Sequence, residues 1–206
     1  MAARRRAETM EENRAKLIKA ARKAFAEKGF AAASMDELTA SVGLTRGALY
    51  HNFGDKKGLL AAVVNQIDGE MAQRAKSAAA TAGDDWERLL AEGVAYIKMA
   101  LDPEVRRIVL LDGPAFLGDP SQWPGQNSCF ESTRQTLTTL IERGELKPMD
   151  AAAAAHLLNS AALNAALWVA ASDDPQQALP KIIDVFTRLA SGLYAHAFLS
   201  DTSAGE

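Results

Sequence analysis

Apolar residues recur at intervals of three and four along most of this 206-residue chain, and that spacing predicts α-helices. In the first quarter of the chain, four polar sequences that can cap a helix each precede such a run; they begin at Thr9, Ser34, Thr45 and Asp55. They predict a helix that Gly29 ends, a short helix that Gly43 ends, a third helix over 46–52 and a long fourth helix.

Helical spacing continues through the remainder of the chain, over residues 84–101, 104–112, 128–146, 149–172 and 174–199. The intervening sequence GPAFLGDPSQWPG is broken by glycine and proline and predicts an irregular connection. No alternating strand pattern and no internal repeat is present. We therefore expect an all-α fold with two domains: residues 1–55, of which 1–8 form a disordered arm, and a larger helical domain over 56–206.

The balance of basic and acidic residues changes close to the same domain boundary. Residues 1–57 hold 12 Lys and Arg against 7 Asp and Glu, whereas the other 149 residues hold 11 against 19. A basic head on an acidic body indicates that the head alone meets a polyanion.

Cysteine content and hydropathy indicate the compartment. The single cysteine, Cys129, excludes an intramolecular disulfide and a cysteine-rich zinc site. The basic start has no apolar segment after it, and the apolar run 151–171 is interrupted by polar residues such as Asn159 and Asn164. We expect a cytoplasmic protein with no membrane contact.

The segment SMDELTASVGLTRGALYHNFGDKKGLL, residues 34–60, has the pattern of a helix-turn-helix, with Gly43 at the turn and apolar residues holding two short helices together. The second helix of such a unit enters the DNA major groove. Arg46, near the start of this helix, can form two hydrogen bonds with a guanine base. The small residues Gly47 and Ala48 allow the helix backbone to approach the DNA closely. Tyr50 and His51 suit phosphate oxygens, as does Lys56 at the start of the long helix.

Residues 14–60, and above all VGLTRGALYHNFGDKKGLL, resemble the N-terminal domain of the TetR family of bacterial transcriptional regulators. The resemblance implies a homodimeric, ligand-responsive repressor that binds a palindromic operator and is released by a small-molecule inducer. It also implies a dimer interface made by the last two helices, for which a buried intramolecular helix pair is an equal alternative. The expected DNA-contacting residues are Ser34, Met35, Thr45, Arg46, Gly47, Ala48, Tyr50, His51 and Lys56. Two positions depart from the family pattern: Lys57 makes this edge more basic, and Gly58 is expected to loosen the first turn of the long helix.

For the effector site, the position of residues in the family favours Met71, Trp86, Phe116 and Phe130, although aromatic residues at helical spacing also serve as plain core. The lack of a charged cluster among them favours a largely apolar effector. A small all-α enzyme and a helical protein-interaction scaffold without DNA binding are the alternatives. The three histidines lack metal-ligand spacing and no catalytic motif accompanies them, so we expect no catalytic residue, metal or cofactor. A scaffold leaves the residues from Thr45 to Lys56 unexplained.

Overall fold

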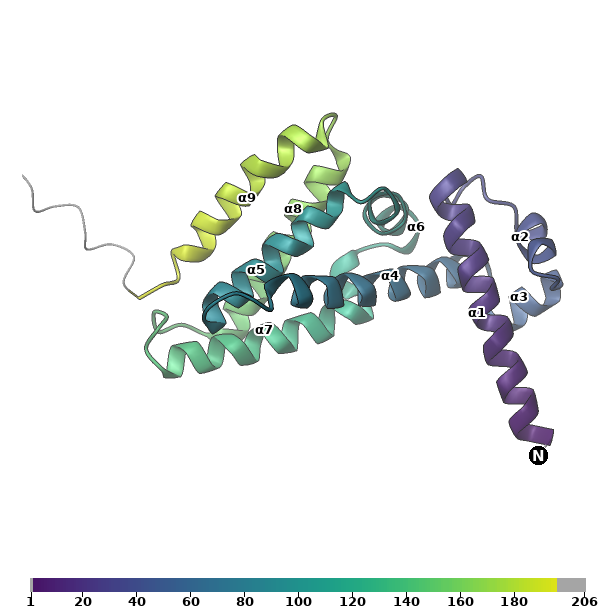
Figure 1. Cartoon of the computed structure of the whole chain (residues 1–206), viewed down its shortest axis with the longest axis horizontal. Coiled ribbons are helices and arrows are strands. Elements are labelled where there is room, and N and C mark those ends of the chain that lie inside the picture. The colour runs from purple at the N-terminus through teal and green to yellow at the C-terminus, as the bar shows by residue number, and fades with distance from the viewer. Residues whose placement is uncertain (1, 196–206) are drawn as a thin grey trace, which may run out of the picture. The chain divides into compact units, whose positions relative to one another are not determined.

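The computed structural model describes residues 2–195, and side chains from Glu8 onward. Every regular element in that part of the chain is helical, which confirms the all-α expectation (Figure 1). The elements are α1 (Ala2–Lys28), α2 (Met35–Ser41), α3 (Arg46–Phe53), α4 (Lys56–Ala79), α5 (Asp85–Lys98), η1 (Met99–Leu101), η2 (Val105–Asp112), α6 (Gly113–Leu117), η3 (Pro120–Gln122), α7 (Pro124–Glu142), α8 (Ala151–Ala171) and α9 (Pro175–Ser191).

The chain forms two compact units, and neither is continuous in sequence. The first unit joins the residues up to Glu70 with Asp102–Trp123, and the second joins Met71–Leu101 with the residues from Pro124 onward. The first unit therefore contains the three N-terminal helices and also η2, α6 and η3, which the sequence pattern had grouped with the larger domain.

Most of the expected helix starts are confirmed by cap hydrogen bonds. The side chains of Ser34, Thr45 and Asp84 accept from the backbone N–H groups of Glu37, Ala48 and Glu87, respectively. Asp55 accepts from the Gly58 N–H at 2.7 Å and so caps α4. Each cap satisfies a backbone donor that the first turn of a helix leaves without a partner.

The first helix starts earlier than expected. It begins at Ala2, so the capping sequence at Thr9 lies inside a helix and residues 2–8 of the expected arm are helical. The reason is local: Ala2 to Glu8 are alanine, arginine and glutamate, which are strong helix formers, and no glycine or proline interrupts them.

The segment from Val105 to Pro120 is also more regular than expected. Val105–Asp112 adopts a π-helix, in which the Gly113 N–H donates to the Ile108 carbonyl five residues earlier. Pro114 has no N–H to continue a four-residue ladder, which favours this wider turn. The glycine- and proline-rich sequence that follows holds the short helices α6 and η3 and is only partly the irregular connection that we expected.

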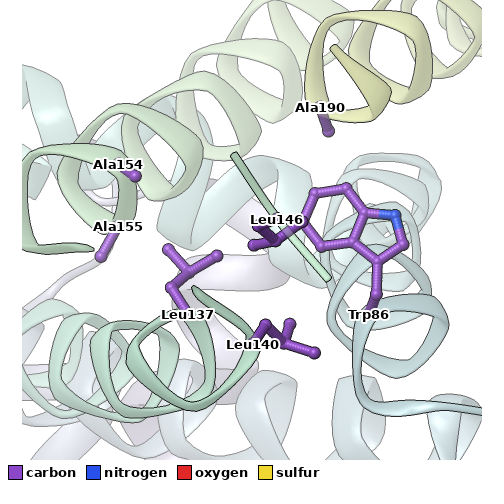
Figure 2. Close-up of a cluster of buried hydrophobic side chains, with 7 residues drawn as sticks. All are labelled: Trp86, Leu137, Leu140, Leu146, Ala154, Ala155 and Ala190. Carbon is purple, nitrogen blue, oxygen red and sulfur yellow. The ribbon is translucent and has the colours of Figure 1, made fainter. Parts of the chain in front are cut away.

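The second unit is a helical bundle in which α8 packs against α5, α7 and α9. Figure 2 shows part of its core, where Trp86 of α5 lies among leucines of α7 and alanines of α8 and α9. Alanine dominates α8, so neighbouring helices pack closely against it. Leu146, between α7 and α8, and Tyr194, after α9, form an isolated antiparallel bridge. The expected helix over 174–199 ends at Ser191, and residues 196–199 lie outside the described part.

One helix in the described part, α8, is long and apolar enough to cross a membrane by length and composition alone. Its buried residues Ala155, Ala166 and Val169 are instead part of the protein core, with 0% exposure. Packing within the bundle accounts for the apolar character of this buried face of α8.

Candidate nucleic-acid interface

The helix α3 is held by one face and exposed on the other. Leu49 is fully buried in the first unit, as are Leu17 and Phe25 of α1, all at 0% exposure. Arg46, Gly47, Tyr50 and His51 are all exposed, and these four positions lie on one side of a helix because they are one and four residues apart. The apolar face therefore fixes the helix, and the exposed face presents a cation, a phenol and an imidazole.

The turn before α3 has the geometry that the sequence predicts. Gly43 has a φ of +67°, a region that side chains rarely adopt, and the Leu44 N–H donates to the Thr39 carbonyl at 2.9 Å. The Thr45 hydroxyl then accepts from the Ala48 N–H at 3.2 Å. Thr45 is exposed, so its side chain caps the N-terminus of α3 and is also accessible from solvent.

Arg46 has two neighbours on the exposed surface. Its guanidinium lies 3.5 Å from the Asp36 carboxylate of α2 and 3.4 Å from the Tyr50 hydroxyl, and it sits 5.7 Å from the centre of the Tyr50 ring. The hydrogen bond to Tyr50 and the charge of Asp36 raise the pKa of Arg46. The side chain is thus pre-positioned beside Tyr50, and Asp36 is a carboxylate that sequence analysis did not place at this surface.

Lys56 is more confined than its sequence position indicates. Its ammonium group donates to the Ala31 carbonyl at 3.2 Å and lies 4.7 Å above the Phe30 ring. Partial burial lowers the pKa of Lys56. The adjacent Lys57 is exposed, so two lysines begin α4, one held against the protein and one in solvent.

The far end of α3 is braced by α1. The Arg14 guanidinium lies 4.7 Å from the Phe53 ring centre and donates to the Asn52 carbonyl at 3.3 Å. Gly58 belongs to the same junction: a Cβ there would collide with the Phe53 carbonyl oxygen. Glycine at position 58 therefore lets α4 start this close to α3, a steric role in addition to the loosened first turn that we expected.

A second polar contact ties α1 to segments far along the chain. Arg22 donates two hydrogen bonds to Glu104 and two to Glu70, at distances between 2.6 and 2.8 Å. The Phe30 N–H donates to the Asp112 carboxylate at 2.8 Å, and the Phe30 ring lies 4.4 Å from that of Phe116. These contacts place η2 and α6 in the same compact unit as the helix-turn-helix.

The remaining predicted DNA-contacting residues lie at the start of α2. Ser34 and Met35 are half-buried, and the Ser34 hydroxyl is engaged in capping. The structure thus brings Arg46, Gly47, Tyr50 and His51 onto one exposed face of α3, and it leaves Ala48 of the same helix partly covered, as it does Ser34, Met35 and Lys56. Contact of each residue with DNA stays a prediction.

The four predicted pocket residues are divided between the two compact units. Trp86 and Phe130 belong to the same apolar cluster of the second unit, where Trp86 is 4% exposed and its ring lies 5.7 Å from that of Tyr194. Met71 is fully buried, and Phe116 packs on Phe30 in the first unit. Trp86 and Met71 fill core, and a role for any of the four in binding an effector stays a prediction.

No group of three or more His, Cys, Asp or Glu side chains among the described residues is arranged to hold a metal ion. The histidine His196 lies outside those residues. In the second unit, an open polar hollow of about 650 Å³ lies along one face of α7 and is lined by Asn127, Ser128, Glu131, Ser132, Gln135 and Thr136. Glu131 there is already paired with Arg134 at 2.6 Å.

Known protein families match both parts of the chain. Residues 17–63 match the model of the family described as bacterial regulatory proteins, tetR family, and residues 86–193 match that of the tetracyclin repressor-like C-terminal domain. Among solved structures, a TetR-family transcriptional regulator from Pectobacterium atrosepticum is 46% identical, with a TM-score of 0.83 over 91% of this chain and 96% of that one.

Two further proteins are similar at lower identity. The HTH-type transcriptional repressor AcnR of Corynebacterium glutamicum is 26% identical over 136 residues, which are 66% of this chain and 69% of AcnR. RolR, solved in complex with resorcinol, is 21% identical with a TM-score of 0.66 over 96% of this chain and all of that chain, a likeness of fold.

Proposed function

Since the chain belongs to the TetR family of bacterial transcriptional regulators, we propose that it is a homodimeric repressor that binds a palindromic operator and leaves it when a small molecule binds. It is a DNA-binding regulator and not an enzyme. Its place of action is the cytoplasm, where the operator is. The first domain, residues 1–55, carries the DNA contacts, and residues 56–206 carry the effector site and the dimer interface.

The observation that carries the proposal is the exposed face of α3. Arg46, Gly47, Tyr50 and His51 share it, while Leu49 on the opposite face is fully buried. A helix fixed by its apolar side and free on its polar side is what insertion into a major groove requires. Arg46 reads a base edge, Tyr50 and His51 bind phosphate, and Thr45 positions the first turn beside the backbone of DNA.

Lys56 and Lys57 bind phosphate at the flank of the groove. For Lys56 to do so, its ammonium group exchanges the Ala31 carbonyl for a phosphate oxygen, a stronger acceptor for a cation. Arg46 likewise exchanges the Asp36 carboxylate for DNA. Asp36 therefore competes with DNA for Arg46. This competition weakens binding to DNA sequences that lack a base able to accept hydrogen bonds from Arg46.

The dimer interface is formed by α8 and α9. Four large apolar side chains on these two helices are exposed in the single chain: Leu157 at 70%, Trp168 at 55%, Val185 at 49% and Leu189 at 69%. Leu157 and Trp168 are about three helical turns apart, and Val185 and Leu189 are one turn apart, so each pair lies on one face of its helix. A second copy of the chain covers this surface, since exposed apolar area of this kind is typical of interfaces.

The effector is a small molecule with a largely apolar surface. RolR, which has the same fold, is known in complex with resorcinol, and this supports a small-molecule site within the helical body. Met71, Trp86, Phe116 and Phe130 are the residues whose substitution we expect to change effector affinity. The effector acts by binding the DNA-free arrangement more tightly than the DNA-bound one.

Gel shifts and footprinting on genomic duplexes test the DNA-binding proposal. We expect a protected pseudo-palindrome with half-site centres about one helical turn, roughly 10 bp, apart. Arg46→Ala should weaken operator binding by about ten-fold or more with little effect on random duplex, whereas Lys56→Ala should weaken both and lower the salt slope by about 1. A single protected half-site at saturation, or no sequence-selective complex, contradicts the proposal.

Sedimentation velocity tests the interface. Trp168→Glu and Leu189→Glu should each shift the protein from dimer to monomer, because a carboxylate is then placed in an apolar contact. Leu111→Glu is the matched control, since Leu111 is an exposed leucine of η2, outside α8 and α9. An unchanged dimer in the first two variants rules out this interface.

A further inference from the structure

The turn that follows α1 is held by the π-helix η2, which lies far along the chain. The Phe30 N–H donates to the Asp112 carboxylate at 2.8 Å. The Arg107 guanidinium lies 3.6 Å from the same carboxylate and donates to the Lys28 carbonyl at 3.5 Å. It also lies against Gly29, where a Cβ would collide with it. Two side chains of η2 therefore fix the backbone of this turn.

The π-helical form of η2 explains why both side chains reach the turn. Arg107 and Asp112 are five residues apart within this helix. In an α-helix they would point about 140° apart, because each residue turns that helix by about 100°. In a π-helix each N–H bonds the carbonyl five residues earlier, so five residues make roughly one turn and the two side chains share one side. The wider turn of η2 is therefore what lets them act on the same segment.

Phe30 connects this turn to the predicted phosphate-binding lysine. The Phe30 side chain is only 6% exposed, and its ring lies 4.4 Å from the Phe116 ring of α6. The Lys56 ammonium group lies 4.7 Å from the centre of the Phe30 ring and donates to the Ala31 carbonyl at 3.2 Å. The attraction of a cation to an aromatic face and one hydrogen bond thus hold the end of a flexible side chain. All of these residues belong to the first compact unit.

The Phe30 ring leaves the Lys56 charge available to DNA. An ammonium group has three N–H donors, and a phosphate oxygen competes for them with the Ala31 carbonyl but not with the face of the ring. A lysine that the ring already holds in place loses less conformational freedom on binding phosphate than a freely rotating lysine does. Contacts that keep the Phe30 ring in place therefore favour the DNA complex.

We propose that Asp112 is a positioning residue for DNA binding: through the Phe30 N–H, it holds the Phe30 ring against the Lys56 ammonium group. The Asp112 side chain is 17% exposed and is occupied by Phe30 and Arg107, so it acts through Lys56 rather than by meeting DNA itself. The inference rests on the proposed function in that Lys56 binds phosphate. It adds a residue of η2, outside the helix-turn-helix, that determines how well this lysine does so.

The test is a double-mutant cycle on the affinity for a fluorescently labelled duplex of random sequence at low salt, measured by anisotropy. Asp112→Ala removes the acceptor, whereas Asp112→Asn keeps an amide oxygen that accepts from the Phe30 N–H. Both variants lose the same charge, so the difference between them reports the hydrogen bond. Asp112→Ala should weaken binding by about three-fold or more, and Asp112→Asn should retain most of the wild-type affinity.

The same substitution in a Lys56→Ala background separates positioning from stability. Because Asp112 acts through Lys56, Asp112→Ala should there have no further effect on the affinity or on the salt slope. A general loss of folding would lower the affinity in both backgrounds, and thermal unfolding of each variant measures it directly. Asp173→Ala, at an exposed aspartate between α8 and α9, is the matched control and should leave the affinity unchanged.

If Asp112→Ala does not fold, Phe30→Leu supplies the same cycle, because it removes the ring and keeps an apolar side chain. Its loss of affinity should likewise disappear in the Lys56→Ala background.

Four results overturn the proposal: no loss of affinity in Asp112→Ala, tighter binding by that variant, an equal loss in Asp112→Asn, and a loss that persists without Lys56. If Lys56→Ala alone leaves the affinity unchanged, the phosphate role of Lys56 and this inference fail together. Failure of the regulator function itself is seen separately, as the absence of a sequence-selective complex of the wild type in the gel shift with genomic duplexes.

Discussion

Replacing Arg22 with methionine removes the polar contact that joins α1 to α4 and to η2. Arg22 makes paired hydrogen bonds to Glu104, at 2.6 and 2.7 Å, and to Glu70, at 2.6 and 2.8 Å. These hydrogen bonds raise the pKa of Arg22 far above its ordinary value, and the bonds to Glu104 contribute most. Methionine has a similar length and no charge, so the substitution removes the bonds and leaves two carboxylates near one another.

The expected loss of unfolding free energy in Arg22→Met lies between two limits. An exposed ion pair contributes about 0–1 kcal/mol, and loss of one partner from a buried pair costs about 3–5 kcal/mol. The side chains of Arg22, Glu70 and Glu104 are 23%, 44% and 31% exposed, so solvent screens the pair with Glu70 more than the pair with Glu104. We therefore expect Arg22→Met to lower the free energy of unfolding by about 2–3 kcal/mol.

Urea unfolding followed by circular dichroism measures this change, with Lys23→Met as the matched control. Lys23 is the next residue of α1, its ion pair with Glu27 is 4.0 Å long, and both side chains are more than half exposed, at 76% and 58%. Lys23→Met should change the unfolding free energy far less. Adding Glu70→Gln and Glu104→Gln to Arg22→Met should restore part of the loss, since the unpaired carboxylates are then removed. Equal effects of the Arg22 and Lys23 substitutions would refute the reasoning.

Three further predictions concern stability. Gly58→Ala should destabilise the protein, because a Cβ there meets a backbone carbonyl oxygen of α3, whereas Gly69→Ala on the same helix meets nothing within 4 Å and should stabilise it by about 0.5–1 kcal/mol; thermal unfolding of both variants decides, and equal shifts would contradict the steric argument. Thr45→Ala should cost about 1 kcal/mol and weaken operator binding, and Thr45→Ser should retain both, because only the hydroxyl caps α3; a loss with serine as large as with alanine would assign the effect to the methyl group. Burial raises the pKa of Asp68 above its ordinary 3.8, so the folded state holds this proton more tightly than the unfolded state does. Below about pH 3.8 the wild type and Asp68→Asn should therefore have similar stability, and the wild type should become the less stable of the two as pH rises through the window up to the raised pKa; parallel stability curves across that window would count against a raised pKa of the Asp68 carboxyl.

Local sequence determined the elements of the DNA-binding head. Caps depend on a side chain and the backbone three residues later, so Ser34, Thr45 and Asp55 start their helices where the pattern predicts. The positive φ of Gly29 and Gly43 likewise follows from residue type. The exposed face of α3 could also be read from sequence, because Arg46, Gly47, Tyr50 and His51 share one arc of a helix and the centre of that arc points away from Leu49.

Only the tertiary structure decided which distant groups meet. The partners of Arg22 lie 48 and 82 residues away, and no periodicity encodes such a distance. Gly58 has the appearance of a weak helix residue until the Phe53 carbonyl is placed beside it. An aspartate on a long helix is ordinarily solvated, so the sequence gives no sign that Asp68 is buried. Its burial depends on which face of α4 the rest of the chain covers, and that is settled by packing between segments rather than by the order of residues within one helix.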